Sequence, residues 1–352
     1  MDRKYLHLLK DTEFTPVFIL GVARSGTTIL LKLLAETQCF NYVQSYHIIK
    51  YNEILRNHLH DQEDLARESL DKQYQALGIS NRGIDHVKVT SSMPSEYGII
   101  LENHNEKSLL NGKKLLQGAL QKGPNPFFDK AKLTSENLPL FNELARKIQF
   151  TSTADKPLLL KNPWDFNNFL YLADTFPQAK FIFIHRYPMA TLNSQLNGLR
   201  TTLTKKIPFF ALQSKPLCRI FHTPWMLGLL RWAAVSPLTI GIRQGLIARD
   251  LFWRLKYFTA NISTMANDRM IELKYEELCA DPAAVMRRLC SFLAVKPTVM
   301  PDYAALVQPR SQSLLPELER RCASICKKFK DYVDYNGYDC TCHQYLLEHK
   351  PL

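Results

Sequence analysis

Short apolar runs alternate with longer amphipathic stretches along the chain, and this alternation predicts a parallel sheet. Pro16–Gly21 is a continuous apolar run that ends at glycine, as is typical of a strand buried on both faces. Further strands are predicted at Lys156–Leu160, Lys180–His185 and Met270–Lys274. Helices are predicted at Asp61–Leu77, Pro94–His104, Asp165–Phe176, Met189–Leu199 and Pro282–Leu293. The pattern predicts an α/β protein with a P-loop-type three-layer fold, in which helices flank a central parallel sheet.

A glycine-rich turn joins the first predicted strand to a stretch of helical periodicity. Gly21 and Gly26 have the spacing of a phosphate-binding loop, whose backbone N–H groups and following helix end attract anions. A nucleoside triphosphatase would have lysine after the second glycine, but this chain has Thr27 there and carries Arg24 inside the loop. The turn therefore indicates an anion site, with a purely structural turn as the alternative.

A second phosphate-binding pattern follows the strand at Lys180–His185. That strand ends in Arg186, and Ser194 follows eight residues later in the next predicted helix. An arginine fork and a hydroxyl can bind one phosphate together. Because ligands of parallel sheets bind at the carboxyl ends of the strands, both patterns are expected at one edge. The alternative is an arginine and a serine that only face solvent.

These two motifs resemble those of sulfotransferases that use 3′-phosphoadenosine 5′-phosphosulfate (PAPS), particularly the broad bacterial group similar to tyrosylprotein sulfotransferases. The resemblance spans residues 16–338 patchily and is weak over 41–150 and 200–265. It implies that the 5′-phosphosulfate is bound by Arg24, Ser25, Gly26, Thr27 and Thr28. It implies that the rest of the cofactor, the 3′-phosphate and the adenine, is contacted by Arg186, Ser194, Tyr275 and Arg310.

Sulfuryl transfer to a hydroxyl needs a base for the acceptor proton, a role that the family gives to His or Glu. Glu96, in SSMPSEYG, resembles the Pro-x-Glu that opens a substrate-facing helix in the bacterial group. Equally, Pro94 would be the first residue of that helix, and a glutamate two positions later simply suits a helix N-terminus. His47 and His104 are the reserve candidates for the base.

The reaction also needs positive charge beside the departing phosphate. Arg24 is the stronger candidate for this role. Lys161 follows a predicted strand and can stabilise the bridging oxygen, although a solvated lysine fits the sequence as well. The implied activity is therefore sulfuryl transfer from PAPS to an acceptor hydroxyl, with no metal.

The net charge of +12 is concentrated in one segment: residues 200–256 hold ten basic side chains and one acid, Asp250. Apolar and aromatic residues lie between them, but Arg219, Arg231 and Arg243 interrupt the run, which argues against a membrane span. The segment is read either as a surface-lying or lid element, or as a core helix with a solvated basic face. The first reading favours a lipid or sterol-like alcohol as acceptor and a peripheral membrane contact through 200–258.

Cysteine usage and the N-terminus give the expected location. None of the eight cysteines forms a CxxC pair, and Cys340, Cys342 and His343 lack a fourth metal ligand at ordinary spacing. Reduced thiols are expected, and no apolar leader opens the chain. These features predict a cytoplasmic protein, peripheral to a membrane surface, with no nucleic-acid-binding module.

The whole chain, 1–352, is predicted to form one sulfotransferase domain. Its parts are a phosphosulfate-loop unit (14–40), a helical acceptor-side insertion (41–150), a 3′-phosphate unit (156–199), a basic hydrophobic insert (200–265) and C-terminal helices (270–340). Two other functions compete with sulfuryl transfer. One is a P-loop kinase, which would need a loop lysine and a Mg²⁺-binding aspartate. The other is a non-enzymatic basic protein that binds membranes.

Overall fold

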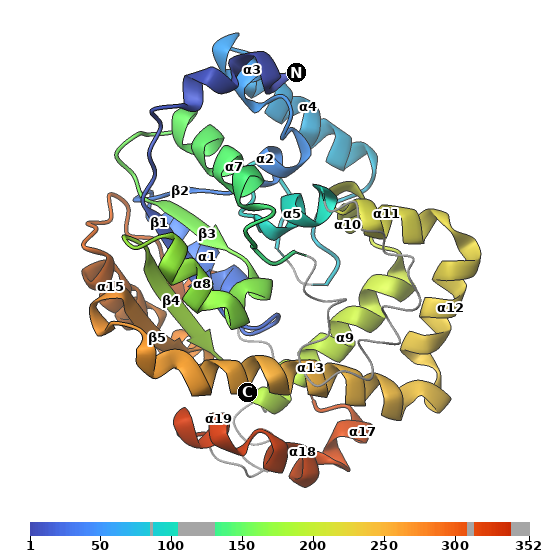
Figure 1. Cartoon of the computed structure of the whole chain (residues 1–352). Helices are drawn as coiled ribbons and strands as arrows, with labels where there is room; N and C mark the ends of the chain where they lie inside the picture. The colour runs from blue at the N-terminus through green and yellow to red at the C-terminus, as the bar shows by residue number, and fades with distance from the viewer. Residues whose placement is uncertain (85–86, 105–130, 308–312, 339–352) are drawn as a thin grey trace.

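A parallel sheet of five strands lies at the centre of the protein (Figure 1). The structure is a computed structural model of the chain, which describes residues 1–84, 87–104, 131–307 and 313–338. The strand order is β2-β3-β1-β4-β5, and every neighbouring pair is parallel. The strands are β1 (Pro16–Leu20), β2 (Asn41–Tyr42), β3 (Leu158–Lys161), β4 (Lys180–His185) and β5 (Met270–Lys274).

Alternate side chains of the strands enter two separate cores, one on each face of the sheet. Val17 and Ile19 point into the core that α1 (Thr27–Glu36), α14 (Tyr275–Ala280) and α15 (Pro282–Leu293) cover. Phe18 and Leu20 point into the larger core on the other face. That face is covered by α7 (Leu138–Phe150), α8 (Phe169–Thr175), α9 (Pro188–Lys205), α13 (Ile240–Asn261), α18 (Cys322–Lys328) and α19 (Lys330–Tyr335). The predicted three-layer α/β fold is confirmed.

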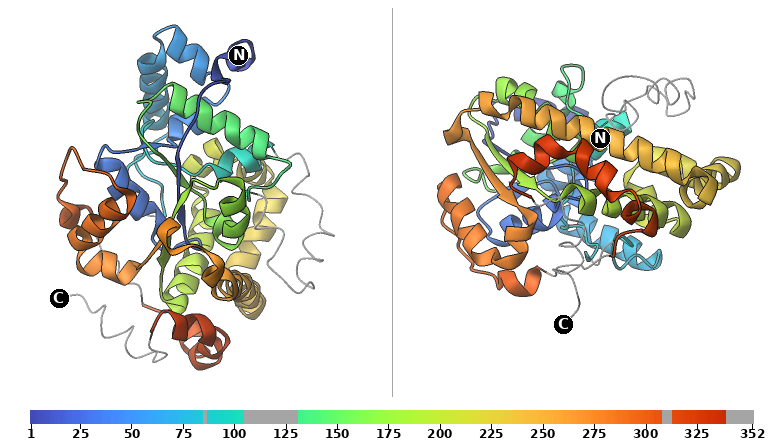
Figure 2. Two further views of the ribbon diagram at one scale, coloured as in Figure 1. Left: turned by 60° about the vertical axis from the view of Figure 1, so that its left-hand side comes forward. Right: turned by 90° about the horizontal axis from the view of Figure 1, so that it is seen from below.

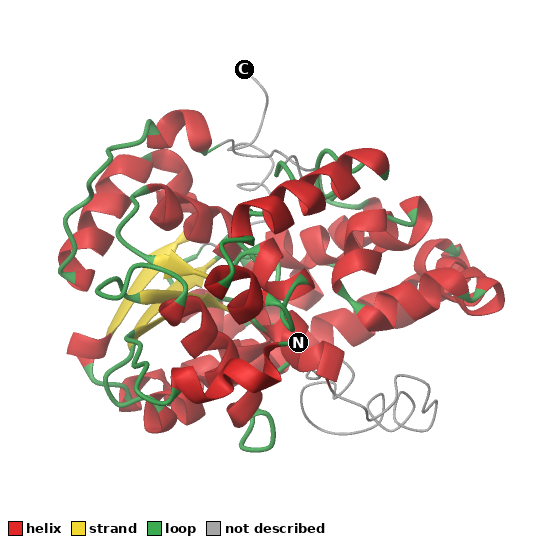
Figure 3. Ribbon diagram, turned by 90° about the horizontal axis from the view of Figure 1, so that it is seen from above, coloured by secondary structure: helices red, strands yellow, loops and turns green. Residues whose placement is uncertain are grey.

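Two groups of helices extend this core (Figures 2 and 3). The first, near the N-terminus, consists of a 3₁₀ helix, η1 (Asp2–Leu9), and of α2 (Ser45–Ile49), α3 (Ile54–Leu59), α4 (Glu63–Ala76) and α5 (Gly98–His104). The second follows α9 and consists of α10 (Pro208–Gln213), α11 (Lys215–His222), α12 (Pro224–Val235) and the 3₁₀ turn η3 (Pro237–Thr239). Short elements complete the described chain: η2 (Pro163–Asn168), η4 (Ile262–Thr264), η5 (Asn267–Arg269), α16 (Tyr303–Leu306) and α17 (Pro316–Glu319).

The sequence predicts four of the five strands, with errors of at most a few residues at their ends. The strand β2 was not predicted, because two residues are too few for a periodic signal. The helix expected to begin at Pro94 begins instead at Gly98, since Pro94 forms an antiparallel bridge with Gln44. The helix expected at Asp165–Phe176 is broken by the non-helical backbone of Asn167, so a 3₁₀ turn precedes α8.

The cysteines only partly follow the expectation of reduced thiols. Cys322 is disulfide-bonded, so that expectation is wrong for this residue. A disulfide needs two Cα atoms within about 7 Å, which cysteine spacing in the sequence does not reveal. The free thiols of the described chain are Cys39, Cys218, Cys279, Cys290 and Cys326.

Candidate active site

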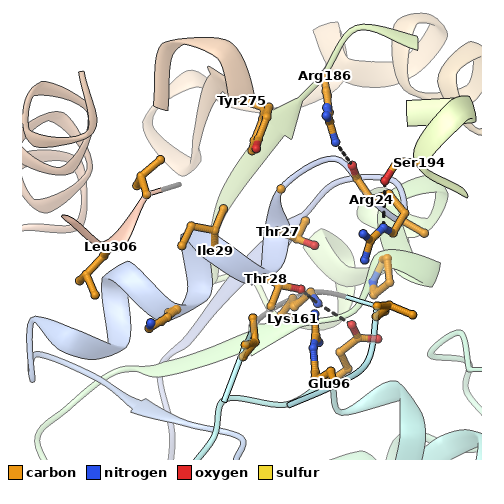
Figure 4. A pocket seen from close by; sticks show the side chains of 18 of the residues that line it. Arg24, Thr27, Thr28, Ile29, Glu96, Lys161, Arg186, Ser194, Tyr275 and Leu306 are labelled. Carbon is orange, nitrogen blue, oxygen red and sulfur yellow. Dashed lines mark hydrogen bonds and ion pairs between the residues drawn. The ribbon is translucent and has the colours of Figure 1, made fainter. Parts of the chain in front are cut away.

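A cavity of about 420 Å³ opens at the carboxyl ends of β1, β3 and β4, beside the first turn of α1 (Figure 4). Segments far apart in the sequence form its wall, because parallel strands bring their carboxyl ends to one edge of the sheet. The cavity is lined by nearly all of the candidate residues within the described chain: Arg24, Gly26, Thr27, Thr28, Glu96, Lys161, Arg186, Ser194 and Tyr275.

The turn between β1 and α1 has the backbone of an anion-binding loop. Arg24 and Gly26 both have positive φ angles, of 72° and 105°, and Gly26 is the N-cap of α1. The main chain thus bends back over the helix end, where unpaired N–H groups and the helix dipole favour negative charge. Two residues that follow β4 hold the loop. Arg186 donates to the Arg24 carbonyl at 2.9 Å, and Gln195 donates to the Ala23 carbonyl at 2.8 Å.

The loop contains one buried hydroxyl, that of Ser25, without a hydrogen-bond partner in the described part of the chain. The Ser25 side chain is fully buried. Leaving a buried polar group unpaired costs about 1–3 kcal/mol, so such a group commonly marks a ligand or an ordered water. Ser25 does not line the cavity, and its Oγ lies against Gly21, so the N-terminus of α1 and the Arg24 guanidinium are the groups placed to bind an anion such as phosphate.

Glycine is required at position 26 by its neighbours as well as by its φ angle. A Cβ at this position would lie 2.4 Å from Cδ2 of Tyr275, which closes the cavity on that side. Tyr275 in turn carries the Arg186 guanidinium 4.4 Å from the centre of its ring. Burial raises the pKa of Tyr275 to about 12, so its hydroxyl stays protonated at neutral pH. Loop, arginine and tyrosine are therefore packed as one unit.

We expect Gly26→Ala to weaken the binding of 3′-phosphoadenosine 5′-phosphate (PAP), measured by calorimetry, about tenfold. Strain at a positive φ costs about 1–3 kcal/mol, and the loop can relieve it only by leaving the anion-binding conformation. Gly241→Ala is the matched control, because a Cβ there meets nothing within 4 Å. Equal PAP affinity of wild type and Gly26→Ala would mean that this loop does not contact the nucleotide.

The second motif lies directly beside the loop. Arg186 follows the last residue of β4, and Ser194 lies two turns into α9. Ser194 Oγ accepts a hydrogen bond from Nε of Arg24 at 3.1 Å, so the two motifs are in direct contact. Three cationic or hydroxyl groups thus converge on one side of the cavity, as expected for binding two neighbouring phosphates.

Glu96 and Lys161 meet on the opposite side of the cavity. The Lys161 ammonium, at the end of β3, donates to Oε1 of Glu96 at 2.5 Å and to Oγ1 of Thr28 at 2.8 Å (Figure 4). Lys161 is buried, whereas Glu96 is 26% exposed and faces the cavity. The interpretation of Glu96 as a residue within the first helical turn is wrong, because α5 begins only at Gly98. The reading of Lys161 as a solvated surface lysine is wrong as well.

The reserve histidines do not line the cavity. His47 is buried in the helix α2, where its Nδ1 accepts from the backbone N–H of Gln44. Burial lowers the pKa of His47 to about 3, so it stays neutral. His104 bonds to the carbonyl of Ile100 within α5. Arg310 lies outside the described residues.

An apolar wall lines the same cavity as Glu96, and sequence reasoning identified none of its residues individually. It consists of Ile84, Val87, Pro163, Trp164 and Phe210, and Arg82 lines the cavity with them. Buried Arg254, in α13, supports this wall: its guanidinium donates to the Trp164 carbonyl at 3.4 Å and to Oδ1 of Asn167 at 2.7 Å. The wall draws on both stretches in which the resemblance is weak, 41–150 and 200–265, together with η2.

A polar network behind β4 was also missed. His185, directly before Arg186, bonds through Nδ1 to the Tyr332 hydroxyl at 2.7 Å and through Nε2 to Glu272 at 2.9 Å. Tyr338 donates to Glu276 at 3.1 Å, and the same carboxylate accepts from the backbone N–H of Tyr187. Tyr332, in α19, and Tyr338, just beyond it, therefore help to hold the residues on both sides of Arg186 through His185 and Glu276.

Comparison with known proteins gives one family. A family model described as the sulfotransferase family matches residues 16–215, more than half of the chain. No curated protein sequence matches it. Among solved structures, sulfotransferase STF9 from Mycobacterium avium superposes with a TM-score of 0.60 at 17% identity, covering 96% of this chain and 81% of that one. Sulfotransferase STF1 from Mycobacterium tuberculosis H37Rv gives a TM-score of 0.54 at 15% identity, covering 95% and 80%.

The two comparisons agree with the site. At these identities the solved structures show that the fold is shared, and the family match decides for sulfuryl transfer over the kinase and the non-enzymatic membrane protein. The cavity, at the carboxyl edge of the sheet with an arginine-bearing loop and no loop lysine, suits that chemistry. This chain belongs to the sulfotransferase family.

Proposed function

We propose that this sulfotransferase moves the sulfuryl group of PAPS onto the hydroxyl of a hydrophobic acceptor. The observation that carries the proposal is the junction of Thr28, Lys161 and Glu96. Its three residues line the same cavity as the anion-binding loop and the apolar wall. A sulfuryl group held by the loop would thus face a hydroxyl held by the wall.

The nucleotide side of the cavity can accommodate both ends of PAPS. Arg24 and the α1 N-terminus, with Gly26, Thr27 and Thr28, would bind the 5′-phosphosulfate, and Ser25 stays a proposed further contact. Arg186 and Ser194 would bind the 3′-phosphate, and Arg310 stays a proposed further contact. Tyr275, Ile29 and Leu306 give the cavity apolar lining against which an adenine would pack.

The acceptor side supplies the base and a cation. The Glu96 carboxylate would take the hydroxyl proton while the acceptor oxygen forms its bond to sulfur and the bond from sulfur to the phosphate oxygen breaks. The electron pair of that bond stays on the phosphate, where Lys161 and Arg24 can stabilise the added charge. In the unliganded protein Lys161 also holds Glu96 in place, so one ammonium would orient the base and then stabilise the leaving group.

The lining of the acceptor side favours an apolar molecule. Ile84, Val87, Trp164 and Phe210 are large apolar side chains, with Arg82 beside them. A lipid or sterol-like alcohol is the proposed acceptor, and contact of 200–258 with a membrane surface would bring the enzyme to it. Transfer of labelled sulfuryl from PAPS to a panel of sterols, lipid alcohols, phenols and tyrosine peptides tests this. A preference for tyrosine peptides would overturn the acceptor class and leave sulfuryl transfer itself intact.

We expect transfer to proceed at an unchanged rate in the presence of EDTA. Arg24, Lys161 and Arg186 bring three basic side chains to the cavity, and phosphoadenosine is already a good leaving group. The measurement is the initial rate with and without EDTA, with Mg²⁺ added back as the control. A strict requirement for Mg²⁺ would show that the cationic side chains alone do not neutralise the leaving phosphate.

A further inference from the structure

Helices α11 and α12, the turn η3 and the outer half of α13 (residues 215–249, here the arm) form a corner that projects from the body of the protein. Figure 2 shows the bent junction of α12 and α13 extending beyond the sheet and its flanking helices. No single helix of the described chain is long and apolar enough to cross a membrane. The pair Pro224–Val235 and Pro237–Thr264 passes that test together, but its two halves are bent by 72°.

The outer face of α12 is apolar although it is largely exposed to solvent. Trp225, Leu229 and Trp232 recur at helical spacing and are more than half exposed. The opposite face, with Leu227 and Ala234, is buried against the end of α9. This helix therefore has an apolar face for the core and a second one for the outside.

The apolar surface continues around the bend. Leu238, in η3, is 84% exposed, and Ile242, one turn into α13, is 68% exposed. Two arginines that interrupt the apolar sequence are used to hold this shape. Arg231 donates to the carbonyls of Leu203 and Thr204, and Arg243 donates to the carbonyl of Ala233. The bend is thus braced from inside, and its apolar side chains stay outside.

Basic side chains are exposed on two of the helices that pack against α12. Exposed cations lie at the end of α9 and on α11, and no acid occurs between residues 200 and 249. These cations are Arg200, Lys205, Lys206, Lys215 and Arg219. Tryptophan and leucine at the level of lipid headgroups, with Lys and Arg beside them, are typical of segments that lie in an anionic membrane interface. Pairing with a second copy would instead bring two strongly basic surfaces together.

We propose that the arm docks on an anionic lipid bilayer, with Trp225, Leu229, Trp232, Leu238 and Ile242 entering the headgroup region. The 72° bend places these side chains on an outer corner, so the arm enters one leaflet and does not cross the membrane. This deepens the membrane contact of the proposed function by naming the residues and the lipid charge. Docking itself does not depend on sulfuryl transfer.

Co-flotation of the full chain with vesicles tests the proposal. The probe is phosphatidylcholine vesicles that contain about 30 mol% of the anionic lipid phosphatidylglycerol. We expect the protein to bind these vesicles at least about tenfold more tightly than vesicles of phosphatidylcholine alone. Raising the salt concentration, for example from about 50 to about 500 mM, is expected to weaken the binding to the phosphatidylglycerol-containing vesicles, because salt screens the attraction between charges. Emission from Trp225 and Trp232 should shift to shorter wavelength on binding, as their surroundings become apolar.

Matched variants separate the apolar and charge contributions. Leu238→Ser/Ile242→Ser is expected to lower binding to the anionic vesicles at least about tenfold, because two exposed side chains lose their apolar burial in lipid. Val299→Ser/Met300→Ser, an exposed apolar pair far from the arm in the sequence, is the control and should bind like wild type. Lys205→Gln/Lys206→Gln/Arg219→Gln should lose the preference for anionic vesicles.

The outcomes that overturn the proposal differ from those that overturn the enzyme function. Equal vesicle binding by wild type and Leu238→Ser/Ile242→Ser would overturn it, as would no binding by wild type at low salt. The proposal would also be overturned if double-stranded DNA displaced the vesicles and bound wild type and Leu238→Ser/Ile242→Ser equally well. That result would indicate a nucleic-acid-binding surface instead. PAP affinity and sulfuryl transfer to a water-soluble alcohol are measured in parallel. If transfer fails, the vesicle experiments still decide whether the arm docks on a membrane.

Discussion

Glu96→Gln is expected to lower the single-turnover rate of sulfuryl transfer by about 10²–10⁴-fold, the usual contribution of a positioned base. Glutamine keeps the size and the hydrogen-bonding oxygen of glutamate, so Lys161 retains both of its partners, Thr28 and the side chain at 96. Only the capacity to take the acceptor proton is removed. The measurement is rapid-quench transfer from labelled PAPS at saturating acceptor.

PAP affinity is the internal control for this substitution. Glu96 lies on the acceptor side of the cavity, so its replacement should leave PAP binding and the melting temperature nearly unchanged. Glu102→Gln, in α5, is a matched substitution outside the cavity lining and should keep the full transfer rate. A wild-type rate for Glu96→Gln would remove Glu96 as the base, and neither His47 nor His104 lines the cavity to replace it.

Arg186→Ala is expected to abolish the preference of the protein for PAP over ADP. Charge-assisted hydrogen bonds contribute about 1.5–3 kcal/mol each, so a bidentate arginine on the 3′-phosphate gives a preference of about 10²–10⁴-fold. Titration calorimetry with PAP, ADP and AMP measures it. Wild type that bound ADP as tightly as PAP would contradict the assignment of the 3′-phosphate site.

Selectivity is the decisive readout because Arg186 also supports the loop. Its guanidinium bonds to the Arg24 carbonyl and stacks on Tyr275, so alanine will weaken the binding of every nucleotide to some degree. Only the ratio of PAP to ADP affinity isolates the 3′-phosphate contact. Arg288→Ala, which removes a half-exposed surface arginine, should leave that ratio unchanged.

The sequence predicts the sheet and the nucleotide side of the site because both depend on local patterns. A buried parallel strand is a continuous apolar run, and each anion motif lies within a dozen residues of such a run. Gly21, Arg24 and Gly26 already determine the loop, and Arg186 and Ser194 are separated by two helical turns. The order of the strands was not predicted, because pairing between distant segments leaves no local signal.

The acceptor side depends on contacts between distant segments. Glu96 and Lys161 are 65 residues apart, and nothing in either neighbourhood indicates their ion pair. The helix expected from Pro94 failed because an extended bridge with Gln44 outweighs the preference of proline for a first helical turn. In the sequence Trp164 and Phe210 are ordinary apolar residues, and only the fold shows that both line one cavity.

The polar network behind β4, formed by His185, Glu272 and Tyr332, has a consequence for how the protein is synthesised. Arg186 follows His185, whose partner Tyr332 lies 147 residues later, close to the end of the described chain. A growing chain on the ribosome would therefore carry both anion motifs long before the helices that fix them have been made. Nucleotide binding in this protein would begin only after Tyr332 has been made and packed against β4, which makes PAP affinity a measure of whether α18 and α19 have folded onto the sheet.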